Sequence, residues 1–293
     1  MTADAQVRPA AIPTPGAPRL DLRRISRIAL YVVLIAAAVF YIIPVYLLFM
    51  TGLKSFAEAA NVARMWNLPQ APNFDSFSEA WRLISPNFMN SAQIAIPAAV
   101  ISSMLGSVNG YILAKWRFRG SETLFTLILF GMFIPYQSIL IPLLQLESAA
   151  GLYGTLQGLV VIHIIYGIPI TTLIFRNYYV GIPEELVEAS RIDGAGFFGI
   201  YRHILLPLSL PGFVVVLIWQ FTSAWNDFLF AVTLTKQSTW PVTVAVNNLA
   251  GSFEVAWNVQ MAGALIAALP TLLIYVLLGR YFMRGLLAGS LKG

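Results

Sequence analysis

PEELVEASRIDGAGFFGIYRHILLPLSLP, residues 183–211, is a polar stretch that separates two long apolar segments of the chain. Pro183 suits the first position of a helix, and Glu184 and Glu185 place negative charge in the first turn, where the helix dipole favours it. Gly194 then allows the helix to end and the chain to turn. We therefore expect a short helix followed by a glycine turn.

A second short helix is predicted directly after this turn. Its apolar side chains recur at the spacing i, i+3, i+4 and i+7, at Phe197, Ile200, Tyr201 and Ile204. Pro207 then opens the next apolar segment. A loop with its own caps and apolar stripe favours a docking surface, whereas the alternative, a solvated connector, needs neither feature.

The composition is that of a membrane protein. Of the 293 residues, 58% are hydrophobic and 11% are charged, and a globule that is soluble in water does not have such a composition. The absence of cysteine excludes disulfides and thiolate chemistry. The two histidines, His163 and His203, do not have the spacing of metal ligands. The net charge of +5 does not come from a basic patch of the kind that binds nucleic acid.

Six apolar segments are each long enough to cross a hydrocarbon core of about 30 Å as a helix. They lie roughly at 28–50, 90–114, 122–144, 155–178, 206–232 and 259–282. The alternation typical of a membrane β-barrel is missing from them. The first segment could be a signal peptide, but it is too long and no small-residue cleavage site closes it. We expect an all-α membrane protein with a flexible tail at 1–24 and a six-helix domain at 25–293.

The distribution of basic residues orients this domain. Cytoplasmic loops carry an excess of Lys and Arg. Only four of the 18 basic residues fall in the predicted outer segments: Lys54, Arg64, Arg82 and Lys236. Both termini and the loop at 181–206 are therefore predicted to be cytoplasmic.

Two polar outer loops are predicted, at 51–89 and 233–258. Each contains tryptophans, among them Trp66 and Trp257. These rings could anchor the chain at the membrane interface or contact a partner, and the sequence leaves both readings open.

Small and polar residues interrupt the apolar segments in two ways. Ser102, Gly106 and Gly110 recur every four residues, a stripe that lets two helix backbones approach closely. Polar groups are costly in a bilayer and usually face a bundle interior or a solute path. Candidates for such a path are Gln137, Gln220, Asn226 and Asp227, although hydrogen bonding between helices would explain each of them as well.

The motifs of energy-converting and catalytic sites are missing from the sequence. It has no G-x-x-x-x-G-K-[ST] phosphate loop, no H-E-x-x-H and no paired carboxylates within the apolar segments. We therefore expect no catalytic residue, no metal and no cofactor on this chain. Any energy for transport has to come from a partner.

The loop that separates the apolar segments resembles the conserved loop of importer-type ABC permeases. The pattern of that loop is E-A-A–x3–G–x9–I–x–L-P. This chain has a similar pattern with the same spacing, in Glu188-Ala189-Ser190, Gly194 and Ile204-x-Leu206-Pro207, and Ser190 is the one departure. The resemblance continues at 115–120, 135–138, 151–155, 224–227 and 284–293. The family it resembles is the maltose-type class of carbohydrate permeases, and within that class the likeness is nearest to glucose/mannose-type importer permeases.

This resemblance implies a type I importer permease with six transmembrane helices in a bacterial cytoplasmic membrane. It implies four kinds of partner: a second homologous permease subunit, two ATP-binding subunits that hold ATP and magnesium, an extracytoplasmic solute-binding protein, and the lipid bilayer. The residues implied to couple to the ATPase are Glu188, Ala189, Ser190, Asp193, Gly194, Ile204 and Pro207, with a second contact at Ser290, Leu291, Lys292 and Gly293. The outer loop 233–257 would probe the binding protein.

The function implied is uptake of a carbohydrate, with a lean towards a monosaccharide such as glucose or mannose. The chain would form the pore and would not be an enzyme. A self-contained secondary transporter is the alternative, and it predicts inverted repeats and a midplane site between broken helices. No repeat between the halves is visible, and such a transporter has no need of the pattern from Glu188 to Pro207. A membrane enzyme would need a catalytic set that the sequence lacks.

Overall fold

The structure is a computed structural model, and it describes residues 22–116, 118–251 and 255–290. Within these ranges every regular element is a helix. The chain divides into two compact units, 1–47 and 48–293. Most of α1 (Leu22–Gly52) belongs to the first unit, where apolar side chains such as Ile35 and Phe40 are exposed along it. Such a helix is suited to a lipid environment.

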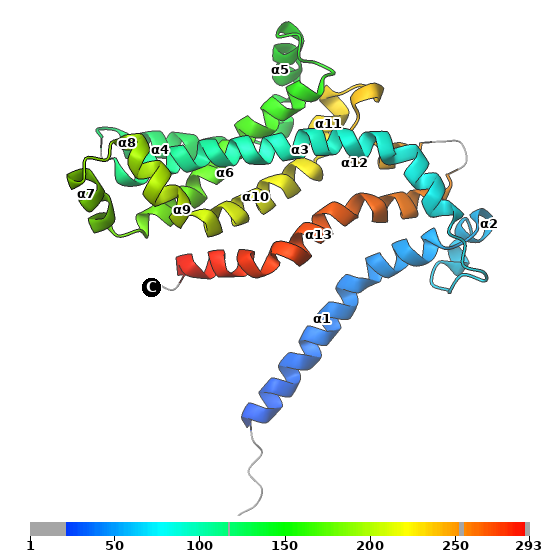
Figure 1. Ribbon diagram of the computed structural model, residues 1–293. Coiled ribbons are helices and arrows are strands. Elements are labelled where there is room, and N and C mark those ends of the chain that lie inside the picture. The colour runs from blue at the N-terminus through cyan, green and yellow to red at the C-terminus, as the bar shows by residue number, and fades with distance from the viewer. Residues whose placement is uncertain (1–21, 117, 252–254, 291–293) are drawn as a thin grey trace, which may run out of the picture. The chain divides into compact units, whose positions relative to one another are not determined.

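The second unit is built from four long helices that pack side by side, together with short helices at their ends (Figure 1). The long helices are α3 (Asp75–Lys115), α6 (Leu156–Val180), α10 (Leu210–Trp225) and α13 (Trp257–Ser290). The other elements are α2 (Phe56–Ala59), η1 (Val62–Arg64), α4 (Ser121–Phe130), η2 (Gly131–Phe133), α5 (Tyr136–Ala149), α7 (Glu184–Ile192), α8 (Phe197–Ile200), η3 (Tyr201–Leu205), α9 (Leu206–Leu208), α11 (Leu229–Leu234), η4 (Gln237–Thr239) and α12 (Val242–Asn248).

The close contact between α3 and α6 depends on glycine. A Cβ atom on Gly110 would lie 2.7 Å from the backbone nitrogen of Arg176, and one on Gly106 would lie 2.8 Å from the carbonyl carbon of Thr171. The Thr171 hydroxyl donates to the carbonyl oxygen of Ser102 at 3.0 Å. The two helices therefore approach closely along the stripe of small residues, because a side chain larger than hydrogen at Gly106 or Gly110 would collide with α6.

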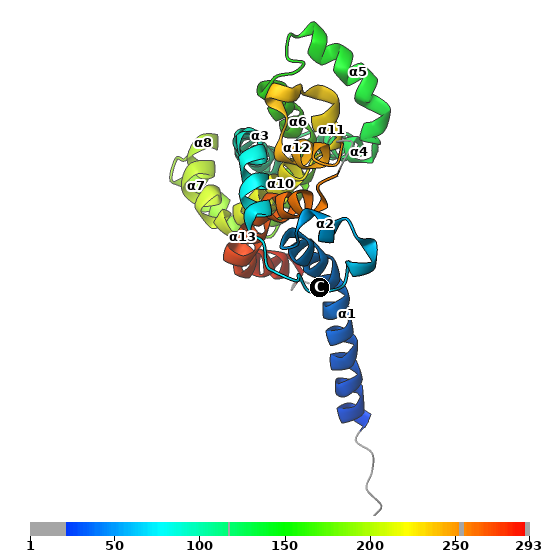
Figure 2. The same cartoon turned by 90° about the vertical axis from the view of Figure 1, so that its right-hand side faces the viewer.

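Four helices are each long and apolar enough to cross a membrane, or six if each of two bent helix pairs counts as one span. This confirms the predicted all-α membrane fold. The structure differs, however, where the sequence predicts a continuous span over 122–144. The pair α4–η2 and α5 bends by 97°, and α5 projects away from the long helices (Figure 2). Pro135 has no N–H group and holds Ile134 in an extended conformation (ψ 116°), which ends the helix there.

The segment predicted as a span over 206–232 is also broken. A bend of 76° separates the part ending at Leu208 from α10, and α10 stops at Trp225. The carboxylate of Asp227 accepts hydrogen bonds from the backbone N–H groups of Phe230 and Ala231 at 3.4 and 3.0 Å, which caps α11. A capping side chain within an apolar run therefore starts a new helix.

The two segments that the sequence predicts as outer loops contain more helix than expected. Residues 75–89 of the predicted loop 51–89 are helical, because α3 begins at Asp75 and extends beyond the apolar part of its sequence. The loop before it is held by Lys54, whose buried ammonium group donates to the carbonyl oxygens of Arg64 and Met65 at 2.8 and 3.0 Å. The segment 233–258 likewise contains η4 and α12.

Candidate functional site

The 181–206 segment lies at one end of the second unit, opposite the end that carries α11 and α12 (Figure 1). The first turn of α7 holds Glu184 and Glu185, as the sequence predicts, and Pro183 is the N-cap, one position before the predicted one. After α7, Gly194 adopts a φ of +82°. Side chains rarely adopt this left-handed conformation, so the turn between α7 and α8 needs glycine at this position.

A buried lysine fixes the start of this segment to the end of α3. The ammonium group of Lys115 donates to the carbonyl oxygen of Ile182 at 2.6 Å and to the carboxylate of Glu184 at 3.1 Å. Lys115 itself is only 7% exposed. The bond to a buried carbonyl is therefore well shielded from water, and α7 is tied to α3.

Aromatic side chains fix the second half of the segment to the same helices. The ring of Tyr111 in α3 stacks on Phe197 and Tyr201, with centroids 4.8 and 5.8 Å apart. The hydroxyl of Ser107 lies 2.6 Å from the hydroxyl of Tyr179 and 2.9 Å from that of Tyr201. This buried network links α3, α6 and η3, so the segment continues the helix bundle as one packed body.

The predicted apolar stripe is shifted by one residue at its end. Ile200 and Tyr201 are buried as expected, but Ile204 is half-buried and Leu205 is completely buried. The reason is that residues 201–205 form a π-helix (η3), in which one extra residue per turn moves the buried position along the chain.

The outer face of the segment is exposed and partly apolar. Ile192 and Phe198 are 86% and 77% exposed, and Glu188, Ala189, Asp193, Gly194 and Pro207 are exposed as well. Ser190, the one departure from the family pattern, is buried and donates to the carbonyl oxygen of Leu186 at 2.7 Å. Large apolar side chains held in the open on a rigid support are typical of an interaction surface.

A cavity of about 690 Å³ lies near the opposite end. We call it the α6–α10 cavity, and it is lined by Met132, Tyr136, His163, Tyr166, Gly167, Ile170, Trp219, Gln220, Ser223, Asn226, Asp227, Phe228, Leu229 and Phe230. Three of the four predicted path residues, Gln220, Asn226 and Asp227, meet here. Gln137 lines neither this cavity nor the smaller one described below, and its side chain is exposed on α5.

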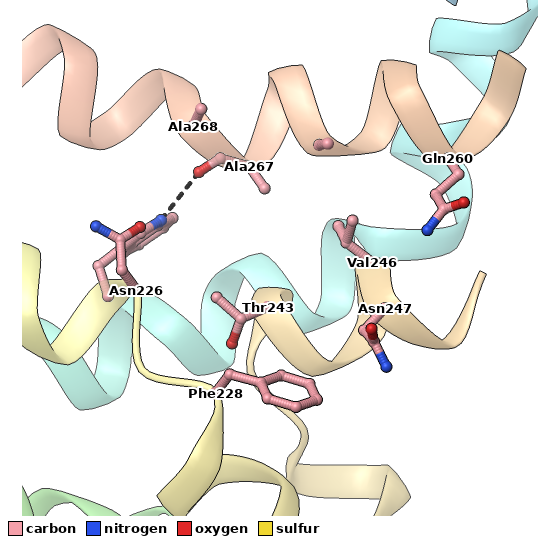
Figure 3. Close-up of a pocket in the computed structure, with 10 residues that line it drawn as sticks. Asn226, Phe228, Thr243, Val246, Asn247, Gln260, Ala267 and Ala268 are labelled. Carbon is pink, nitrogen blue, oxygen red and sulfur yellow. Dashed lines mark hydrogen bonds between the residues drawn. The ribbon is translucent and has the colours of Figure 1, made fainter. Parts of the chain in front are cut away.

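A second cavity of about 380 Å³ lies on the other side of the break after α10. Asn226, Thr243, Asn247 and Gln260 supply its polar lining. In Figure 3 Gln260 comes from α13, Thr243 and Asn247 come from α12, and Asn226 follows the end of α10. The indole N–H of Trp225 donates to the carbonyl oxygen of Ala267 at 3.0 Å. Asn226 and Phe228 line both cavities, so the break separates two polar hollows.

Several lining residues of the α6–α10 cavity were not predicted as site residues. Trp219, Tyr136 and Phe230 lie in or beside continuously apolar stretches, where the sequence does not tell a lipid-facing ring from a cavity-facing one. Among the described residues, no group of three His, Cys, Asp or Glu side chains could hold a metal ion. Of the predicted C-terminal contact, Ser290 ends α13, and 291–293 lie outside the described residues.

Comparison with known proteins places this architecture among transport proteins. Residues 106–287 match the family described as binding-protein-dependent transport system inner membrane component. The chain is 49% identical over 276 residues to a probable ABC transporter permease of Pyrococcus horikoshii, covering 93% of this chain and 100% of that relative. It is 36% identical to the xylose/arabinose import permease of Haloferax volcanii, covering 91% and 93% of the two chains. It is 32% identical to the glucose import permease of Saccharolobus solfataricus, covering 90% and 95%.

The fold is also found among solved structures. A bacterial ABC transporter involved in the import of the acidic polysaccharide alginate superimposes with a TM-score of 0.76 at 22% identity, covering 92% of this chain and 100% of that one. The methionine transporter MetNI in an inward-facing conformation gives a TM-score of 0.55 at 18% identity, covering 71% and 98%. At these identities the likeness shows a shared fold, the type I importer permease fold.

Proposed function

Since the chain belongs to the family of binding-protein-dependent transport system inner membrane components, we propose that it is the pore-forming subunit of an ATP-driven carbohydrate importer. In this proposal the 181–206 segment docks on an ATP-binding subunit at the cytoplasmic face. The observation that carries the proposal is the combination of a firmly anchored segment with an exposed apolar face.

Anchoring matters because a coupling element transmits a displacement to the transmembrane helices only if it is fixed to them. The bonds from Lys115 to Ile182 and from Ser107 to Tyr201 join the segment to α3. Closure of the ATPase pair would therefore displace α3, α6 and α10 together. The bundle would rock between two packings, one open to each side of the membrane, and this chain would make or break no covalent bond.

The exposed face supplies the docking contacts. Ile192 and Phe198 are the apolar anchors, and buried apolar anchors usually dominate the energy of an interface. Glu188 and Asp193 add negative charge beside them, and Ala189 and Gly194 leave room for the partner to approach. In the proposal Ile204 and Pro207 support the segment at its membrane end, and residues 290–293 form the second contact with the ATPase.

Sugar is the proposed solute because the relatives that are named for a solute include transporters of xylose, arabinose, glucose and alpha-glucosides. A monosaccharide is the finer proposal, supported by the names of two relatives. Further partners would be a second permease subunit and an extracytoplasmic binding protein, with ATP and magnesium held on two ATP-binding subunits. Relatives of the same fold include an alginate transporter in complex with its periplasmic protein.

Reconstitution tests the function. The chain would be incorporated into liposomes with its cognate permease, ATPase and binding protein, and uptake of radiolabelled D-glucose, D-xylose and L-arabinose would be measured with and without ATP inside. We expect accumulation of at least one sugar that requires both ATP and the binding protein. Uptake by this chain alone, driven by an ion gradient and indifferent to ATP, would establish the secondary transporter instead.

A further inference from the structure

The α6–α10 cavity combines a cluster of aromatic rings with polar groups that have no complete set of partners. Phe230 lies at the centre of the cluster, with ring centroids 5.5 Å from Tyr136, 5.1 Å from Tyr166 and 6.1 Å from His163. Trp219, half-exposed on α10, adds a further indole to the lining. A ligand in this cavity therefore meets several aromatic surfaces.

The polar groups of the cavity are held in fixed positions. The Nε2 atom of His163 is buried without a hydrogen-bond partner and lies 3.5 Å from a carboxylate oxygen of Asp227. The amide nitrogen of Gln220 donates to the carbonyl oxygen of His163 at 2.8 Å. Gly167 makes room for that amide, since a Cβ there would lie 2.7 Å from its Cδ atom. A buried polar atom without a hydrogen bond is costly, so a ligand group that reached His163 beside Asp227 would be stabilised there.

The charge of the lining selects the kind of ligand. Lys and Arg are absent from the residues that line the cavity, which gives no counter-charge for an anionic solute. The Asp227 carboxylate is already engaged by two N–H groups of α11, and it is the single carboxylate in the lining, too few for a metal cation. A neutral solute with both apolar faces and hydroxyl groups fits this lining. A sugar ring has such a surface, because its C–H faces can stack on aromatic rings and its rim of hydroxyls can bond to Asp, Asn, Gln and His.

We infer that the α6–α10 cavity binds one sugar ring on its way through the membrane, an inference that rests on the proposed function. The volume of about 690 Å³ lies within the usual range of small-molecule sites. From the rise of a helix, the part of α6 that lines the cavity, His163 to Ile170, lies roughly 10–20 Å inward from the start of α6 at Leu156. The site is therefore within a membrane span, where a binding protein outside could not supply these contacts.

A cysteine-protection experiment tests this inference, and the absence of native cysteine makes it clean for this chain. Ser223→Cys places a thiol at an exposed position in the cavity lining, and Ser148→Cys places one at an exposed position on α5 outside it. The complete importer in liposomes would be treated with a thiol reagent, with binding protein, ATP and whichever of D-glucose, D-xylose or L-arabinose it accumulates. Labelling of this chain would be followed by mass spectrometry.

We expect the transported sugar to slow labelling at Ser223→Cys by about tenfold when its concentration is ten times that for half-protection. Its mirror-image isomer should give no protection, and Ser148→Cys should be unaffected by either. Equal labelling rates with and without sugar, in liposomes that accumulate that sugar, would overturn the site but leave the proposed function intact. A thiol that reacts in the isolated chain but not in the assembled importer would also overturn it, because another subunit would then fill the cavity. Failure to accumulate any of the three sugars with ATP would contradict the proposed function itself.

A matched pair of substitutions provides a second measurement. Trp219→Phe keeps an aromatic face in the cavity, and Trp219→Leu removes it while keeping an apolar side chain. We expect Trp219→Leu to lower the amount of sugar accumulated per ATP hydrolysed by about fivefold, in line with the strength of aromatic stacking, and Trp219→Phe to retain most of it. Normal sugar accumulation per ATP in the leucine variant would show that the ring does not contact the solute.

Discussion

The two ends of the second unit are built on opposite principles. At one end the 181–206 segment is joined to α3 and α6 by a buried ammonium group, stacked rings and a network of hydroxyls. At the other end α10 breaks, two cavities open beside the break, and the Nε2 atom of His163 has no hydrogen-bond partner. Tight packing transmits movement, whereas hollow polar space admits a solute. This contrast supports the proposal that the 181–206 segment receives the movement of the ATPase and that the end with the cavities contacts the solute.

The largest effect is expected from loosening the packed end at its ammonium anchor. Lys115→Met leaves the buried carbonyl oxygen of Ile182 without its donor, at a cost of about 1–3 kcal/mol. Because the segment would then move separately from α3, we expect ATP-dependent uptake to fall by about tenfold or more, since 1.4 kcal/mol corresponds to a factor of ten. Arg82→Met, which removes an exposed ion pair near the other end, serves as the control and should leave uptake near normal. Equal losses in both variants would refute the special role of Lys115.

The α3–α6 contact connects the two ends, and a methyl group should wedge it apart. Gly110→Ala places a Cβ atom 2.7 Å from a backbone nitrogen of α6. Overpacking of this kind costs about 1–3 kcal/mol, so we expect a lower thermal-unfolding midpoint for the purified chain in detergent. Gly279→Ala is a matched control in α13, where the added methyl group meets no atom within 4 Å. A midpoint unchanged by Gly110→Ala would mean that the helices separate without cost.

A smaller effect is expected from the turn at Gly194 in the 181–206 segment. Gly194→Ala forces an alanine into the left-handed conformation, at about 1–2 kcal/mol, although no atom obstructs the new methyl group. We expect weaker co-purification of the ATPase subunit. Gly196→Ala, two residues away with an extended backbone and equally open space, should co-purify normally. If the two variants behave alike, the left-handed turn has no part in docking.

The smallest effect should come from removing one hydroxyl of the buried network. Ser107→Ala removes the hydroxyl that bridges those of Tyr179 and Tyr201. The loss of one hydrogen bond typically lowers the free energy of unfolding by about 1 kcal/mol. Tyr179 keeps its bond to Ser209 at 3.1 Å. We therefore expect a modest fall in the thermal midpoint with uptake largely preserved, measured beside Ser148→Ala as a surface control. A loss of uptake as large as that of Lys115→Met would show that the hydroxyl network dominates the coupling.

The sequence was informative where local chemistry decides the structure. Continuous apolar runs predict membrane helices, Pro183 with its acidic neighbours predicts α7, and the small residues from Ser102 to Gly110 predict a close helix contact. Each of these signals lies within a few turns of one helix. The expectation of an all-α membrane fold is therefore confirmed by the structure.

Features that depend on distant parts of the chain were not predictable. Pro135 is visible in the sequence, but the 97° angle between α4–η2 and α5 is not, because it is a relation between two helices in space. The π-helix over 201–205, in which Leu205 is buried instead of Ile204, was not predicted from the spacing of the apolar side chains. The α6–α10 cavity joins residues from 132 to 230, and its rings are indistinguishable from lipid-facing ones in an apolar run.

Crosslinking at Phe198 tests the central claim most directly. Phe198 in the 181–206 segment is 77% exposed, and Val62 in η1 is 80% exposed. Each would be replaced by cysteine in a separate variant, Phe198→Cys and Val62→Cys. The assembled importer would be treated with a short bifunctional thiol crosslinker after a cysteine has been placed in the cleft of the ATP-binding subunit. The account predicts a crosslink from Phe198→Cys to the ATPase, with uptake arrested until the linker is cleaved, and none from Val62→Cys. Absence of the Phe198 crosslink in an importer that still takes up sugar with ATP would contradict it.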